Sequence, residues 1–128
     1  MKKSDPKAVA GELPLLELST ATTEAEAMAA MRVLDHFEGL MVGVTHFSGL
    51  TPWERHGQDE FLYVLDGAVE VTLWHEAGPE TDMGSAGAVF IVPKGVWHRQ
   101  LPKPAVKLMF ITGDTEVSYE ETPPQSST

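Results

Sequence analysis

From Met31 onward, the chain alternates between short apolar segments and turns that contain glycine or proline. Several of these segments place apolar residues at every second position, which is the pattern of a strand with one buried face. The sequence predicts a hairpin over residues 31–48 and further strands at Phe61–Leu65, Ala68–His75, Thr81–Ser85, Trp97–Leu101 and Ala105–Thr112. Asp66-Gly67 is expected to form a hairpin turn. Many short strands with little helix predict an all-β sandwich or a small antiparallel β-barrel.

The flanking segments differ in composition from this strand-rich region. Residues 1–12 are polar and predict a flexible N-terminal tail, whereas Leu13–Leu18 is apolar around a proline and predicts an edge strand. A short helix is expected to begin at Thr22 or Thr23 and to run to about Ala30, with an extended segment as the alternative. Residues 31–113 would then form one barrel, and residues 114–128 an acidic, loose C-terminal tail.

Composition limits the classes of partner. A formal net charge of −10 disfavours nucleic acid and anionic membranes, which bind basic surfaces. No apolar run is long enough to cross a bilayer, and the N-terminus lacks the apolar core of a signal peptide, so a cytoplasmic location is expected. The chain has no cysteine, so any metal ion must be held by histidine and carboxylate side chains.

Two stretches concentrate residues that can bind a metal ion. In the first, Glu54 and His56 share a face if the chain is extended, and Glu60 follows at the start of a predicted strand. In the second, an apolar strand and a Pro-x-Gly turn precede His98. Together they predict a site for a divalent metal, while the alternative is that Glu60 pairs with Arg55 or with an arginine beyond the second turn, Arg99.

These stretches resemble the two motifs of the cupins, G-x5-H-x-H-x(3,4)-E-x6-G and G-x5-P-x-G-x2-H-x3-N. The resemblance covers roughly residues 31–113. Three positions depart from the motifs: Glu54 replaces the first histidine, Gly49 lies one residue too close, and Pro102 replaces the asparagine. The positions that match the family spacing are His56, Glu60 and Gly67 in the first motif and Gly87, Pro93, Gly95 and His98 in the second.

The resemblance implies a double-stranded jelly roll and a barrel that holds a divalent metal, which could be Fe, Mn, Zn or Ni. Its ligands would be His56, Glu60 and His98. Glu54 could be a fourth ligand or only a neighbour of the site, or its presence could mean that metal binding has been lost and the pocket is empty. Gln100 and His46 are candidate contacts for a small-molecule ligand. Cupins include oxygenases, isomerases and lyases as well as non-catalytic binding proteins, so either function follows, with an oxygenated organic molecule as the expected substrate. A homodimer, formed through edge strands, is also expected.

Overall fold

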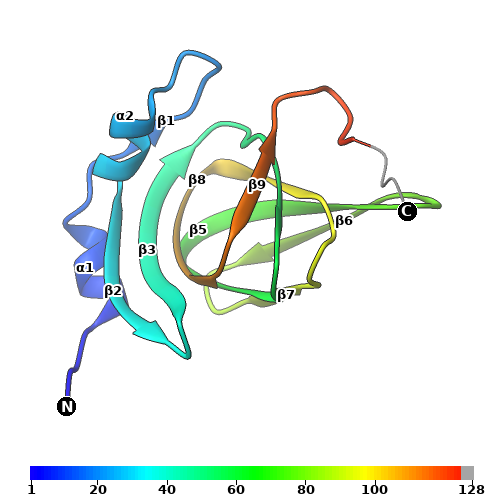
Figure 1. Ribbon diagram of the computed structural model, residues 1–128. Coiled ribbons are helices and arrows are strands. Elements are labelled where there is room, and N and C mark those ends of the chain that lie inside the picture. Colours follow the sequence, from blue (N-terminus) through cyan, green and yellow to red (C-terminus); the bar gives the residue numbers. More distant parts are fainter. Residues whose placement is uncertain (125–128) are drawn as a thin grey trace.

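The computed structural model describes residues 1–124 as an all-β fold, as the sequence predicts, with two short helices where at most one was expected. The strands form a curled sheet, and the helices lie along one outer side and one end of it (Figure 1). No helix among these residues combines the length and apolar character needed to cross a membrane. In chain order the elements are α1 Pro6–Gly11, β1 Leu16–Glu17, α2 Glu24–Ala29, β2 Met31–Phe37, β3 Leu40–Ser48, β4 Trp53–His56, β5 Glu60–His75, β6 Gly78–Ser85, β7 Val89–Val92, β8 His98–Thr112 and β9 Thr115–Ser118.

Two long antiparallel strands, β5 and β8, connect the two halves of the fold. The second half of β8 pairs with β3 and with the first half of β5, which also pairs with β7. The first half of β8 pairs with the second half of β5, and its first residue with β4, while β6 and β9 lie at the outer edges. The result is two facing sheets that share their long strands, which is the arrangement of a jelly roll.

The prediction of a hairpin turn at Asp66-Gly67 is wrong, because β5 continues through these two residues as one strand. The register against β8 shifts on both sides of Gly67, so the strand bends there and passes from one sheet to the other. Gly67 has a φ of +81°, and a side chain at this position would overlap the carbonyl oxygen of Ala105. The dipeptide therefore permits close approach of two strands and does not reverse the chain.

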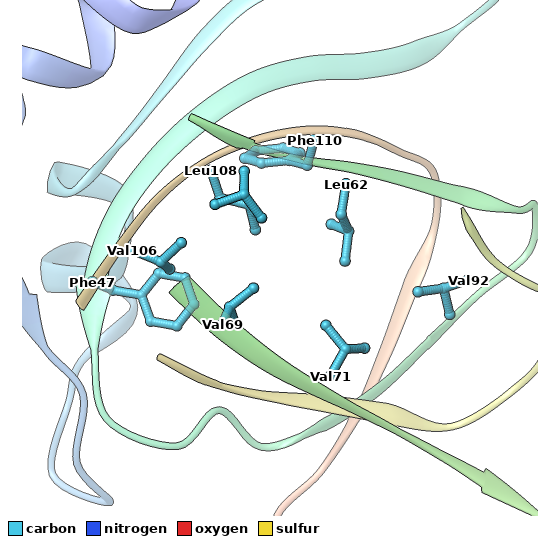
Figure 2. Close-up of a cluster of buried hydrophobic side chains, with 9 residues drawn as sticks. Phe47, Leu62, Val69, Val71, Val92, Val106, Leu108 and Phe110 are labelled. Atoms are coloured by element: carbon cyan, nitrogen blue, oxygen red, sulfur yellow. The ribbon is translucent and has the colours of Figure 1, made fainter. Parts of the chain in front are cut away.

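The main core fills the space between the two facing sheets. Figure 2 shows its aliphatic and aromatic side chains pointing toward one another from β3, β5, β7 and β8. Leu62 and Val64 are nearly or fully buried and alternate with half-buried Phe61 and Tyr63, as the period of a strand requires. The buried members are Phe47, Leu62, Val64, Val69, Val71, Val92, Val106, Leu108 and Phe110.

The predicted N-terminal tail is instead a folded segment. Asp5 caps α1 by accepting a hydrogen bond from the backbone N–H of Ala8 at 3.2 Å, and a proline occupies the first turn. Ala10 is fully buried and Leu13 is 6% exposed, because both pack on the outer face of the sheet. Polar residues predominate in this segment, but its few apolar residues are enough to fix α1 against β3.

The segment that follows matches the sequence prediction more closely. Thr23 caps α2, and a capping box with Glu26 closes the first turn of the helix. The predicted edge strand is reduced to β1, which pairs in parallel with the end of β3.

The predicted C-terminal tail is also partly ordered. Residues 115–118 form β9, which pairs along the whole of β4. The indole N–H of Trp53 donates to the carbonyl oxygen of Glu121 at 3.1 Å, and this bond holds the chain beyond β9. Residues 125–128 of the predicted tail lie outside the described residues.

Candidate metal centre

Three strands bring His56, Glu60 and His98 together inside the fold. His56 ends β4, Glu60 begins β5, and His98 begins β8. Along β4, Trp53 and Arg55 face one way while Glu54 and His56 face the interior cavity. The alternation of the strand therefore delivers the predicted residues to one place.

The donor atoms of these three residues form a compact cluster. All of them lie within 4.8 Å of one another. Glu60 lies between the two imidazoles, with Oε1 3.0 Å from His98 Nε2 and Oε2 3.3 Å from His56 Nε2. The three residues are only 1–6% exposed, so the cluster is closed to bulk solvent.

Contacts on the far side of each imidazole favour the tautomer that carries its proton on Nδ1. His98 Nδ1 lies 3.3 Å from the carbonyl oxygen of Val96, which can only accept, so Nδ1 carries the proton. His56 Nδ1 lies 3.0 Å from Oγ1 of Thr115, whose hydroxyl already donates to Gly113 and is therefore left to accept from Nδ1. The same Nδ1 lies 3.1 Å from the hydroxyl of Thr112, which can accept or donate. Each neutral imidazole then points the lone pair of Nε2 at a carboxylate oxygen of Glu60.

Two nitrogen lone pairs that face an ionised carboxylate need a cation between them, either protons or a metal ion. Burial alone would raise the pKa of Glu60, but its close contacts with His56 and His98 outweigh burial and lower the pKa to about 2. Burial alone would lower the pKa of His56, yet the contact with Glu60 and the charges of Glu60 and Glu54 raise it. Glu60 is therefore held as a carboxylate, the form that binds metal ions.

The donor set fits a divalent transition-metal ion. Two imidazole nitrogens and one carboxylate are common ligands of such ions, and three protein ligands leave coordination positions open. Among residues 1–124, the buried Nε2 of His56 has no hydrogen-bond partner, because its contact with Glu60 lacks the alignment of a hydrogen bond. A buried polar atom without a partner is costly, and a metal ion at this position removes that cost.

Glu54 lies beside this cluster without belonging to it. It pairs across the β4–β8 ladder with His98 and lines the same cavity, but it is not one of the residues whose donor atoms lie within 4.8 Å of one another. Burial raises the pKa of Glu54, the charge of Glu60 raises it further, and the two histidines partly offset both effects. The structure thus places Glu54 next to the cluster, as a weaker acid than an ordinary glutamate side chain.

The cluster adjoins a cavity of about 380 Å³. Its polar end contains Glu54, His56, Glu60 and Gln100, whereas its walls are mostly apolar and come from the main core, from β1 and from α2. The apolar wall residues are Leu16, Leu18, Ala27, Met28, Met31, Met41, Phe47, Leu62, Leu108 and Phe110. A cavity with these walls and one polar end is typical of a site for a small organic molecule.

Residues 46–101 match the family model of the cupin domain. This part of the chain is similar to the cupin domain. Similar solved structures include a cupin-2 domain-containing protein from Shewanella frigidimarina, with a TM-score of 0.55, 22% identity, and coverage of 69% of this chain and 79% of that one. No curated protein matches the chain in sequence.

Two further structures resemble this chain over more of its length. A protein from Neisseria meningitidis has a TM-score of 0.64 and 17% identity, and the match covers 91% of this chain and 100% of that one. A hydroquinone 1,2-dioxygenase in complex with Cd²⁺ and 4-hydroxybenzonitrile has a TM-score of 0.61 and 20% identity, and the match covers 85% of this chain and 71% of that one. At these identities the likeness establishes the fold.

The two predicted ligand contacts differ in position. Gln100 lines the cavity two residues after His98 on β8, on the same face of the strand. His46 does not line it, which corrects the prediction: its neighbours Thr45 and Phe47 face the cavity, so the pleat turns His46 outward. There its Nδ1 contacts the carbonyl oxygen of Leu13 at 3.2 Å.

The alternative in which Glu60 pairs with an arginine does not hold in this structure. Arg55 stacks on Trp97 and forms an ion pair with Glu116 at 3.0 Å. Arg99 stacks on the ring of Trp53, 4.4 Å from its centroid. Both arginines therefore lie on the outer faces of their strands.

The sequence analysis missed the residues that orient the histidines. Thr115 belongs to β9, within the segment that was predicted to be a loose tail, and Thr112 contacts the same His56 nitrogen at 3.1 Å. The alternation of Thr115 and Val117 with polar residues was an available signal for a short strand. The acidic composition of the tail concealed it.

Proposed function

We propose that this cupin binds a divalent metal ion through His56, Glu60 and His98 and acts on a small oxygenated organic molecule in the adjacent cavity. The observation that carries the proposal is the convergence of two Nε2 lone pairs on one buried carboxylate, at the polar end of a cavity with apolar walls. When bound, an ion with open coordination positions supplies Lewis-acid chemistry, or redox chemistry in the case of iron.

The residues around the cluster have separate roles in this proposal. Thr115 and the carbonyl of Val96 hold the Nδ1 protons, so that each Nε2 stays free to bind the ion. Leu62, Leu108 and Phe110 exclude water from the cavity wall. Glu54, whose pKa is raised mainly by burial, can hold a proton beside the cluster or serve as a fourth ligand.

Elemental analysis of the purified protein tests the metal site. We expect about one equivalent of Fe, Mn, Zn or Ni in the wild type and in His75→Ala, and little in His98→Ala. His75 is a matched control because it also contacts a glutamate, Glu80 at 2.6 Å, but at the surface. Circular dichroism checks that each variant is folded. Undiminished metal in folded His98→Ala would refute the site.

The role of Glu54 is tested in the same experiment with Glu54→Ala. Loss of metal would make the site two histidines and two glutamates, an oxygen-richer set that suits Mn(II) and Fe(II). Retained metal would make Glu54 a neighbour of a three-ligand site. In this structure Glu54 lies outside the compact cluster, which favours the second result.

A non-catalytic binding or sensor protein is the second candidate function. It is favoured by the glutamate at position 54, where the family motif has a histidine, and by the mostly apolar cavity. Because two structural relatives are hydroquinone 1,2-dioxygenases, one of them with 4-hydroxybenzoate bound, phenols belong in the first substrate screen. Binding without turnover by the metal-loaded protein would support the second candidate.

The predicted homodimer stays a prediction, and sedimentation of the chain at micromolar concentration would test it. In the structure, β1 already pairs with β3 of its own chain through residues 16–17.

A further inference from the structure

The charges around the cavity restrict the class of molecule that it can hold. The described residues that line it include three glutamates, Glu24, Glu54 and Glu60, and neither lysine nor arginine. An anionic group on the ligand would therefore meet apolar walls or further negative charge, with no lysine or arginine to compensate it. The one histidine among the described residues of the lining, His56, already faces Glu60. Moving a charge from water into such surroundings is costly.

A bound metal ion does not change this conclusion. Two glutamates, Glu54 and Glu60, lie at the polar end of the cavity, and with Glu54 ionised as a fourth ligand they balance the charge of one divalent ion. The whole chain also has a formal net charge of −10, which repels anions at a distance. The cavity therefore favours uncharged molecules whether or not metal is present.

Gln100 indicates which polar group such a molecule carries. The residue is 8% exposed and lines the polar end of the cavity, and among residues 1–124 its Oε1 has no hydrogen-bond partner. Its backbone is fixed by two hydrogen bonds with Thr51, from Gln100 N to Oγ1 at 2.9 Å and from Thr51 N to the carbonyl oxygen at 3.0 Å. The backbone that carries this side chain is thus held at a defined place in the cavity wall, and the amide oxygen has no partner of its own among the described residues.

An amide can accept a hydrogen bond through its oxygen and donate through its nitrogen, and a hydroxyl group complements both. From these observations we infer that the ligand of this cavity is an uncharged molecule with an apolar body and a hydroxyl group that binds Gln100. The inference rests on the proposed function for the role of the ligand, and it excludes organic acids from the broader class of oxygenated molecules.

Three probes that share one aromatic body test this inference. 4-Ethylphenol has the hydroxyl group and no charge, 4-hydroxyphenylacetate adds a carboxylate, and 4-ethylanisole lacks the hydroxyl hydrogen. Titrations followed by NMR, including the side-chain amide signals of Gln100, are run on metal-free and metal-loaded protein. We expect 4-ethylphenol to bind at least about tenfold more tightly than 4-hydroxyphenylacetate in both forms, and several-fold more tightly than 4-ethylanisole.

Two pairs of variants separate the charge effect from the hydrogen bond. Met28→Lys supplies a cation at the cavity wall, and is expected to strengthen binding of 4-hydroxyphenylacetate by about fivefold. Met83→Lys is its control, because Met83 on β6 is similarly exposed, at 51% against 56% for Met28, but does not line the cavity. In Gln100→Leu, the preference for 4-ethylphenol over 4-ethylanisole should disappear, whereas Gln100→Asn should retain part of it.

Equal or tighter binding of 4-hydroxyphenylacetate by wild-type protein would overturn the inference. So would an undiminished preference for 4-ethylphenol in Gln100→Leu. These outcomes are independent of the proposed function, since elemental analysis decides whether the metal site exists. Correct selectivity in a protein that takes up no metal would refute the metal proposal and leave the ligand class intact.

Discussion

Replacing Glu60 with glutamine is expected to destabilise the metal-free protein in one pH window only. The pKa of Glu60 is lowered from 4.5 to about 2, and its side chain is 7% exposed. A shift of this size corresponds to about 3 kcal/mol of stabilisation of the ionised form in the folded protein. Glutamine keeps the shape of the side chain and removes its charge, so this stabilisation should be lost.

The limits of the window follow from the two partners. Because the folded-state pKa of Glu60 is depressed, its contribution is present above pH 4.5 and is lost as the pH falls toward 2. The contribution also needs a protonated imidazole. The pKa of His56 would be lowered by burial but is raised above 6.5 on balance, so this part is present below 6.5 and is lost as the pH rises through the raised value. The largest effect therefore lies between these limits.

Urea unfolding of EDTA-treated protein measures the effect. Near pH 5.5, Glu60→Gln should lose about 3 kcal/mol of unfolding free energy. Near pH 8.5 the loss should be below about 1 kcal/mol, because the glutamine N–H can donate to an imidazole lone pair. Glu80→Gln, beside exposed His75, is the control and should cost less than about 1 kcal/mol at both values. An equal loss at both pH values for Glu60→Gln would refute the reasoning.

Two further predictions concern the fold and use chemical unfolding as the assay. Gly67→Ala should lower the free energy of unfolding by about 3 kcal/mol or more, because its Cβ adds an overlap with Ala105 to the strain of a positive φ. The control is Gly87→Ala, also at positive φ but in open space, which should lower this free energy by about 1 kcal/mol. Equal losses for the two variants would contradict this account. Leu13→Ala should cost about 2–4 kcal/mol, whereas Leu15→Ala, at a position 45% exposed, should change little. No effect of Leu13→Ala would mean that the N-terminal segment does not stabilise the fold.

Sequence periodicity predicted most of the strands because burial on one face leaves a local pattern. The hairpin at residues 31–48 formed as expected, with Glu38 and Gly39 at positive φ in its turn. The bend at Gly67 could not be predicted in the same way, because an Asp-Gly pair also suits a hairpin. Its conformation is decided by pairing with residues 105–106, almost forty positions along the chain. The residues next to Gly67 in the sequence do not indicate which distant segment will pair with it.

The ends of the chain were predicted wrongly for a related reason. The composition of a segment indicates whether it can form a hydrophobic core by itself. It does not indicate whether a few of its residues pack on a sheet formed by other parts of the chain. Ala10 and Leu13 cover Val44 and Leu65 on the outside of the sheet. At the other end, β9 gains its order from β4, and it supplies Thr115 to His56.

The residues of the candidate site could be predicted because motif spacing and strand alternation act together. His56 and Glu60 are four positions apart across a short loop, and His98 follows a turn that ends at Gly95, whose N–H donates to the carbonyl oxygen of His56 at 2.9 Å. That bond ties the two motif segments together directly. The tautomers were beyond sequence analysis, since they depend on Val96 and Thr115 in the folded chain.

Under the proposed function, the glutamate at position 54 connects the proposed metal site with the choice of ligand. A histidine there, as in the family motif, would be a neutral ligand and would leave one positive charge on a site with a divalent ion and one carboxylate. Glu54 supplies a second carboxylate within reach of the charge of Glu60. When ionised beside a bound ion, it would remove the positive charge that attracts an organic acid, in a cavity that is lined, among its described residues, by neither lysine nor arginine. Glu54→Gln should then strengthen binding of 4-hydroxyphenylacetate to the metal-loaded protein by several-fold and leave the affinity for 4-ethylphenol unchanged. Unchanged binding of both probes would mean that Glu54 does not determine which ligand binds.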